Sequence, residues 1–365
     1  MQADFVARLQ GAASRLVDIG GRALLVAPSP DLRYLIGYEP MPLERPTVLV
    51  VDAGGDAALI VPELERPLAA ATPAADALEL VSWRDDQDPY ALIASRIAGG
   101  GTIYVGDRIW GSHVLALQGM HPGAAWASAA PVVGAMRARK DEAELEALRG
   151  AARAADGALV ELLSEPLGGR TERAVAERLS GLLVDHGHDT AEFTIVASGP
   201  NAASPHHEPT ERRIEPGDAV VLDFGGTVDG YYSDTTRTVV MGEPGERLRT
   251  VHEVVARAQR AATDSVRPGV EIEAVDRAAR AVIDEAGFGE RFIHRTGHGI
   301  GLELHEPPYA TVGDRTVLEP GMTFSVEPGI YLDGDLGVRI EDIVAVTDDG
   351  VVSLNTTSRD LVVVE

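Results

Sequence analysis

One short stretch strongly limits what this chain can fold into: residues 220–238, VVLDFGGTVDGYYSDTTRT. The Asp229-Gly230 pair between two apolar arms predicts a β-hairpin with a two-residue turn. The first arm is apolar enough to be buried, yet Asp223 lies within it, and Asp234 lies in the return arm. An unpaired carboxylate is not buried without a large cost in desolvation. The fold must therefore provide partners for these two carboxylates.

The turn also predicts the register of this hairpin, in which Asp223 lies opposite Thr236. Because side chains alternate between the two faces of a strand, Asp223 and Asp234 then share one face as diagonal neighbours. Two carboxylates in this arrangement can bind one cation or a pair of cations. The alternative interpretation is a solvated hairpin face with no ligand.

A second hairpin is predicted at residues 322–346, MTFSVEPGIYLDGDLGVRIEDIVAV, with its turn at Asp333-Gly334. Glu327 ends one apolar arm, and Glu341 interrupts the other, where it shares a face with Arg339. The alternative interpretation is an exposed ion pair between Glu341 and Arg339.

Between the hairpins lies a segment rich in histidine and glycine, HRTGHGIGLELHE at 294–306. Its glycines make a helix unfavourable, so His294 and His298 do not form a helical metal site. A phosphate loop is poorly supported, because no strand, glycine loop and helix follow in order. His206, in SGPNAASPHHE, is a further loop candidate beside His207.

Taken together, the candidate ligands are one imidazole and four carboxylates: Asp223, Asp234, His298, Glu327 and Glu341. Oxygen-rich sets of this kind suit manganese, cobalt or iron, and zinc tolerably. Four carboxylates over-neutralise one divalent ion but balance two. The sequence therefore predicts a two-metal site.

The length of 365 residues favours two domains. Strands at 22–27, 47–53, 57–62 and 102–107, with helices at the start and at 91–99, predict an α/β domain over residues 1–135. Helices from about residue 140 and at 171–187, 245–266 and 271–287, mixed with hairpins, predict an α+β domain over residues 136–365.

Composition excludes several classes of function. A net charge of −25 argues against nucleic acid and anionic membrane partners. The chain has no cysteine, which excludes disulfides, zinc thiolates and cysteine nucleophiles. Its one lysine, Lys140, lies in no Walker-type loop. The sequence has no apolar stretch of membrane-spanning length and no signal-peptide pattern at its start, so we expect a cytoplasmic protein.

These motifs resemble the pita-bread-fold metallopeptidases, and within them the group of Xaa-Pro dipeptidases (prolidases) and Xaa-Pro aminopeptidases (aminopeptidase P). The resemblance rests on LDFGGTVDGYYSDTTRT, HRTGHGIGLELHEPP, VEPGIY and VRIEDIV, while SPDLRYLIGYEP at 29–40 is typical of the creatinase-like N-terminal domain. It implies an α+β pita-bread catalytic domain preceded by a smaller α/β creatinase-like domain.

The resemblance also implies a role for each residue. Asp223 would hold one metal ion, Asp234 and Glu341 would bridge both ions, and His298 and Glu327 would complete the second. His206, His294 and His305 would handle substrate, with Glu327 moving a proton and Arg339 placed beside the bridging glutamate; these are the catalytic candidates.

The implied activity is hydrolysis of the Xaa-Pro bond at the N-terminus of di- or oligopeptides by water or hydroxide held between two divalent ions, with manganese expected before cobalt, zinc or iron. A proline-containing peptide is the implied partner, and a homodimer the implied assembly. The compact chain resembles small prolidases, which predicts that dipeptides are cut faster than tripeptides. The alternatives are a creatinase-like or phosphotriester hydrolase on the same fold, and a binding scaffold that has lost catalysis. The complete ligand set argues against creatinases and against the scaffold.

Overall fold

The structure, a computed structural model, describes residues 4–365. By its internal contacts the chain divides into two compact units between Arg137 and Ala138. The domain boundary between residues 135 and 136 stays a prediction.

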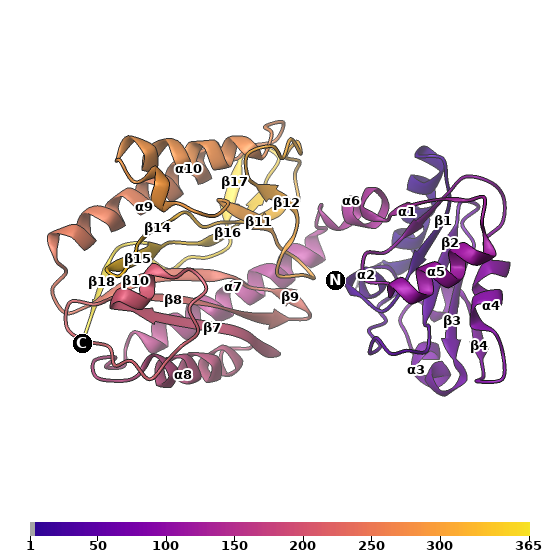
Figure 1. The fold of residues 1–365 in the computed structure, drawn as a ribbon, viewed down its shortest axis with the longest axis horizontal. Coiled ribbons are helices and arrows are strands. Elements are labelled where there is room, and N and C mark those ends of the chain that lie inside the picture. Colours follow the sequence, from indigo (N-terminus) through magenta and orange to yellow (C-terminus); the bar gives the residue numbers. More distant parts are fainter. Residues whose placement is uncertain (1–3) are drawn as a thin grey trace. The chain divides into compact units, whose positions relative to one another are not determined.

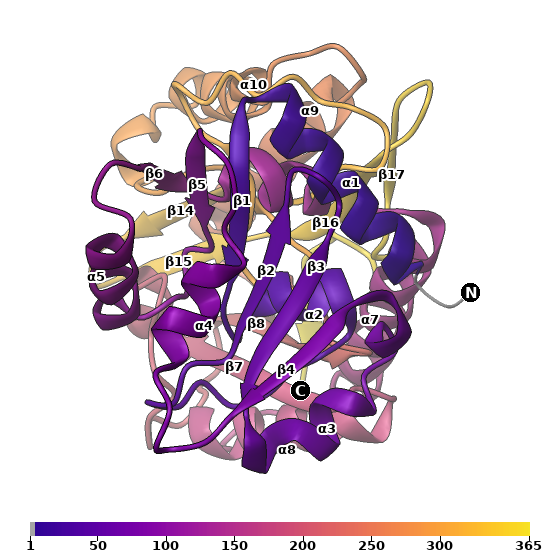
Figure 2. The same ribbon diagram turned by 90° about the vertical axis from the view of Figure 1, so that its right-hand side faces the viewer.

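The first unit is built on one six-stranded sheet, which Figure 2 shows face on. The strand order is β4-β3-β2-β1-β5-β6, with β2 antiparallel to both neighbours and the other pairs parallel. Its strands are β1 (Gly21–Val26), β2 (Val48–Asp52), β3 (Ala57–Pro62), β4 (Glu79–Trp83), β5 (Thr102–Val105) and β6 (Ala125–Ser128). Its helices are α1 (Phe5–Asp18), α2 (Pro30–Ile36), α3 (Arg66–Ala70), α4 (Pro89–Ser95), α5 (Gly111–Met120) and α6 (Ala135–Arg137). The predicted α/β class is confirmed.

The second unit contains two five-stranded sheets and one two-stranded hairpin (Figure 1). One sheet has the order β18-β10-β8-β7, with β9 paired to β8, and the other has the order β12-β11-β13-β16-β17. The strands are β7 (Thr190–Ser198), β8 (Ala219–Val228), β9 (Tyr231–Tyr232), β10 (Thr235–Met241), β11 (Gly297–Gly299), β12 (Glu306–Ala310), β13 (Thr323–Val326), β14 (Gly329–Leu332), β15 (Leu336–Arg339), β16 (Asp342–Val346), β17 (Val351–Ser353) and β18 (Val362–Val364). The helices are α7 (Glu142–Leu162), α8 (Glu172–Asp185), α9 (Glu246–Ser265) and α10 (Glu273–Glu285).

Two apolar cores hold this second unit together. Helices α7 and α8 pack against β8 through side chains such as Leu159, Leu179 and Phe224. Helices α9 and α10 pack against β13 to β16 in the other core. All four helices were predicted from the sequence, and the α+β class is confirmed. No helix among residues 4–365 is both long and apolar enough to cross a bilayer.

The first predicted hairpin is confirmed in its turn and its register. Asp229 and Gly230 both have positive φ, 50° and 73°, as the expected two-residue turn requires. Asp223 lies opposite Thr236, as predicted. The ladder is irregular just before β10, where the amide of Gly226 bonds to the hydroxyl of Ser233 instead of a carbonyl.

The second hairpin keeps one register but is interrupted in the middle. Its outer part, β14 with β15, closes over a three-residue loop, since Leu332 pairs with Leu336. Its inner part, β13 with β16, belongs to a different sheet. At the break, the amide of Glu341 donates to Thr236 O (3.0 Å) and the amide of Glu327 to Thr296 O (2.8 Å). The two acids therefore lie where the chain changes partners.

The single lysine forms a buried ion pair. Lys140 Nζ lies 2.8 Å from Glu306 Oε1, and the side chains are 1% and 4% exposed. The pair joins the start of the second unit to the residue that follows His305. A buried pair of this kind depends on both partners, because removing one leaves an uncompensated charge.

Candidate metal centre

A cavity of about 400 Å³ in the second unit brings the predicted site residues together. All nine line it: His206, Asp223, Asp234, His294, His298, His305, Glu327, Arg339 and Glu341. The remaining lining residues are Phe193, Ile195, Pro205, Arg295 and Leu304. The cavity is thus acidic and imidazole-rich on one part of its wall and apolar on another.

Three buried carboxylates converge, one from the middle of β8, one from just before β10 and one from the break between β15 and β16. One oxygen from each of Asp223, Asp234 and Glu341 lies within 4.8 Å of the others. Asp223 Oδ1 and Glu341 Oε1 are buried without a hydrogen-bond partner in the described chain. Buried polar atoms in native proteins normally have partners, so these two oxygens point to an absent ligand. A divalent cation fits them, because carboxylate oxygens are its preferred donors.

The other oxygens of Glu341 and Asp223 are held by neighbouring side chains. Thr236 Oγ1 donates to Glu341 Oε2 (2.6 Å), and Arg339 Nη2 donates to Asp223 Oδ2 (2.5 Å). Arg339 Nε also donates to Thr236 Oγ1 (3.1 Å). Asp223 and Glu341 thus each have one oxygen fixed by protein and one left over. The alternative interpretation, an exposed ion pair between Glu341 and Arg339, is wrong, because both residues are buried and Arg339 pairs with Asp223.

His298 and Glu327 approach from the second sheet. His298 Nε2 lies 3.4 Å from both Asp234 Oδ2 and Glu327 Oε1. His298 Nδ1 contacts Gly299 O at 3.2 Å. A carbonyl only accepts, so Nδ1 carries a proton. Nε2 is then the nitrogen that faces the carboxylates, and its lone pair would serve a bound ion. Gly297 is required here, because a Cβ would lie 1.8 Å from Ser325 O.

Crowding of these acids changes their protonation. Burial raises the pKa of Asp223, raises that of Glu327 to about 7, and raises that of Glu341 well above its usual value. Burial alone would lower the pKa of His298, but the hydrogen bond to Asp234 and the charge of Glu327 raise it. The protein alone therefore lacks positive charge at this point, which bound cations would supply.

His294 belongs to a chain of hydrogen bonds that leaves neither ring nitrogen free. Arg339 Nη1 donates to Tyr331 OH (2.8 Å), and Tyr331 OH contacts His294 Nε2 (2.9 Å). His294 Nδ1 contacts Arg295 O at 2.7 Å. Burial raises the pKa of Tyr331 to about 12 and lowers that of His294 to about 4, so the hydroxyl donates to a neutral ring. His294 therefore presents carbon atoms to the cavity.

His305 and His206 are exposed side chains at the cavity. The ring of His305 lies 3.9 Å from that of His298, centroid to centroid. Partial burial, and then the charge of His298, lower the pKa of His305 to about 4, so it is a neutral donor near pH 7.

The loop that carries His206 is fixed by a buried acid that the sequence did not reveal. Glu172, at the start of α8, accepts hydrogen bonds from Ser198, Asn201, His207 and Thr210. Tyr331, Thr236 and Arg295 were also missed. Only Tyr331 gave a local signal, as a polar aromatic residue in a strand predicted to be buried beside Glu327.

Comparisons with known proteins agree with this geometry. Residues 146–348 match metallopeptidase family M24, and residues 8–139 match the creatinase/prolidase N-terminal domain. The probable dipeptidase PepE of Mycobacterium bovis is 44% identical over 367 aligned residues, covering 99% of this chain and 96% of the relative. An Xaa-Pro dipeptidase of Lactobacillus delbrueckii subsp. lactis is 37% identical, covering 90% and 91%.

The crystal structure of dipeptidase PepE from Mycobacterium ulcerans superposes with a TM-score of 0.95 at 42% identity, covering 99% of this chain and 98% of that one. The predicted resemblance and fold are confirmed. With its sequence, its fold and its cavity in agreement, the chain belongs to metallopeptidase family M24, with a creatinase/prolidase N-terminal domain.

Proposed function

We propose that this protein is a two-metal Xaa-Pro dipeptidase. The observation that carries the proposal is the pair of buried carboxylate oxygens, Asp223 Oδ1 and Glu341 Oε1, that no group of the described chain satisfies. They lie beside Asp234 and, through Glu341, beside His298 and Glu327.

In this proposal the five ligands divide between two divalent ions. Asp223 would hold one ion, Asp234 and Glu341 would be shared by both, and His298 and Glu327 would complete the second. Bound divalent ions would supply a water of lowered pKa as the nucleophile near neutral pH. Manganese is our first choice of ion, ahead of cobalt, zinc and iron, because the set is rich in oxygen.

The remaining side chains act on the peptide. Neutral His305 donates a hydrogen bond to the carbonyl oxygen of the first residue as negative charge develops there. Glu327 carries a proton toward the departing proline nitrogen. His294, whose nitrogens are occupied, packs its ring against the proline together with His206.

Arg295 supports a preference for dipeptides. It lines the cavity, and its guanidinium lies over the ring of Tyr309, 4.4 Å from the centroid. Among residues 4–365 it has no carboxylate partner. A guanidinium without an acid partner at a peptide site suits the free carboxylate that ends an Xaa-Pro dipeptide. A longer peptide places an amide there instead.

The test is a panel of Xaa-Pro, Xaa-Pro-amide, Xaa-Pro-Yaa and Xaa-Ala peptides, assayed on metal-free protein and after addition of Mn²⁺, Co²⁺ or Zn²⁺. We expect metal-dependent cleavage of Xaa-Pro, slower cleavage of the amide and the tripeptide, and none of Xaa-Ala. Creatine and a phosphotriester cover the alternative hydrolases. Faster cleavage of the tripeptide would assign the protein to the aminopeptidases instead, and failure to cleave any Xaa-Pro bond would refute the proposal.

Arg295→Met sharpens the test. We expect it to raise the KM for Xaa-Pro by about tenfold, equivalent to about 1.4 kcal/mol, and to leave the amide nearly unaffected. Arg153→Met, at an exposed pair with Glu146 on α7, is the matched control. A homodimer and a cytoplasmic location remain predictions from the sequence, and the chemistry above requires neither.

A further inference from the structure

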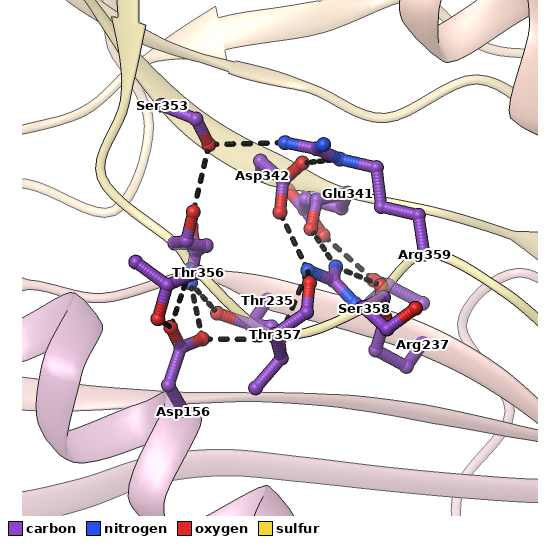
Figure 3. A network of polar contacts seen from close by, with 12 residues as sticks. Asp156, Thr235, Arg237, Glu341, Asp342, Ser353, Thr356, Thr357, Ser358 and Arg359 are labelled. Carbon is purple, nitrogen blue, oxygen red and sulfur yellow. Dashed lines mark hydrogen bonds and ion pairs between the residues drawn. The ribbon is translucent and has the colours of Figure 1, made fainter. Parts of the chain in front are cut away.

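A buried polar network joins Glu341 to residues 355–359, called here the C-terminal segment (Figure 3). Its centre is Arg237, whose side chain is 4% exposed. Arg237 does not line the cavity and takes no part in the chemistry proposed above. Its position therefore calls for another explanation.

Arg237 binds a backbone carbonyl on each side of the contact between β10 and Glu341. Its Nη1 donates to Thr236 O (2.9 Å) and to Glu341 O (2.6 Å). The same two residues are joined directly, because Glu341 N donates to Thr236 O (3.0 Å) and Thr236 Oγ1 donates to Glu341 Oε2 (2.6 Å). Glu341 is thus held through its amide, its carbonyl and one carboxylate oxygen, while Oε1 is left for a ligand.

The other nitrogens of Arg237 bind the C-terminal segment and one acid. Nε donates to Ser358 O (2.9 Å), and Nη2 donates to Thr357 O (3.1 Å) and Thr357 Oγ1 (3.0 Å). Nη2 also donates to Asp342 Oδ1 (2.7 Å). All three nitrogens of the guanidinium are therefore engaged, and the group has one position.

The C-terminal segment is anchored in turn by Asp156 of α7. Asp156 accepts hydrogen bonds from Thr356 N (2.5 Å), Thr356 Oγ1 (2.8 Å) and Asn355 Nδ2 (3.2 Å). Thr357 Oγ1 contacts the same carboxylate at 3.2 Å. These contacts fix the carbonyls that Arg237 binds, as Figure 3 shows.

We infer that Arg237 is a positioning residue for Glu341 and that the C-terminal segment holds Arg237 in place. This inference rests on the proposed two-metal site. Without the guanidinium, Thr236 O and Glu341 O lose a charged donor and the contact between the two residues loosens. The Glu341 carboxylate then no longer has a fixed place beside Asp223 and Asp234. Both ions would share Glu341 as a ligand, so the loss of affinity would show in the more weakly held ion, which is the second to bind.

Arg359 provides a matched control within the same network. It pairs with the same acid, through Nε to Asp342 Oδ2, and its Nη2 donates to Ser353 Oγ (3.2 Å). It is 35% exposed and has no contact with Glu341 or Thr236 within the described chain. Loss of either arginine removes one positive charge from Asp342, but only loss of Arg237 frees Glu341.

The experiment is a calorimetric titration of metal-free protein with Mn²⁺, checked by the absorption spectrum of the Co²⁺-loaded protein. We expect wild type to bind two ions, Arg237→Met to bind the second at least tenfold more weakly, and Arg359→Met to match wild type within twofold. Arg237→Lys, which keeps a charge and donors, should recover part of the loss. The Co²⁺ bands should change shape only in Arg237→Met.

Asp156→Asn keeps Arg237 but loosens its anchor, and it replaces Arg237→Met if that variant does not fold. A smaller loss of second-ion affinity is expected there. The inference would be overturned if the variant measured, Arg237→Met or Asp156→Asn, bound each ion with the same affinity as wild type. The proposed function would then remain intact. Binding of fewer than two ions by wild type would overturn both.

Discussion

The strongest local prediction concerns Glu172, the buried acid that fixes the loop carrying His206. Its side chain is 0% exposed, and both oxygens accept several hydrogen bonds, including ones from Ser198 N (2.8 Å) and Thr210 Oγ1 (2.7 Å). Burial alone would raise its pKa, but these bonds outweigh burial and lower it from 4.5 to about 2. We predict that Glu172→Gln loosens the loop without touching any proposed metal ligand.

The size of the effect follows from the pKa. A depression from 4.5 to about 2 corresponds to roughly 3 kcal/mol of stability near neutral pH. Because the folded pKa lies below the unfolded one, this stability is complete above pH 4.5 and is lost as the pH falls through about 2. The substitution also replaces an acceptor oxygen by an amide NH₂, which is a donor and would face the donors that now bind Glu172. We expect a loss of roughly 3 kcal/mol at pH 7.

The assay is urea unfolding of metal-free wild type and Glu172→Gln, followed by circular dichroism between pH 7 and pH 3. The difference in free energy of unfolding should shrink below pH 4.5. On loaded enzyme, kcat/KM should fall by roughly 10- to 100-fold, since small displacements of catalytic groups are costly, while metal content stays unchanged. Glu211→Gln, at a 74% exposed acid paired with Arg173, is the control. A difference below about 1 kcal/mol, or one independent of pH, would refute the reasoning.

Three further predictions concern the site and its support. Asp234→Ala or Glu341→Ala should abolish activity and reduce bound metal, and unchanged metal in both by elemental analysis would contradict the bridging assignment. His305→Ala should keep its metal but turn over about 100-fold more slowly or worse; normal turnover would remove it from the catalytic residues. Lys140→Met should cost about 3–5 kcal/mol in unfolding free energy, with much of it restored by adding Glu306→Leu; equal stability of both variants would contradict a buried pair.

The sequence predicted the elements whose signals are local. The Asp229-Gly230 turn set the register of the first hairpin, so the placement of Asp223 opposite Thr236 followed by alternation alone. Long amphipathic helices such as α9 and α10 were found for the same reason. The edge strands β4 and β6 were missed, because their partly exposed residues do not show the apolar alternation of a half-buried strand.

Features that depend on distant partners were not predictable from sequence. The break in the second hairpin arises because Glu341 N bonds to Thr236 O, more than 100 positions away. The candidate ligands could be named, since acids in apolar arms are unusual, but the groups that hold them could not. Arg237 and Glu172 look like ordinary residues of a strand and a helix start until the segments that they join are seen together.

The burial of the only lysine has a practical consequence. Reagents that acylate ε-amines have no other side chain to attack in this protein, and Lys140 is 1% exposed. Modification at this position therefore requires the pair with Glu306 to open. The rate of acylation at Lys140, measured by mass spectrometry of the peptide that contains it, therefore reports how often the segment next to His305 opens. The measurement needs no engineered probe.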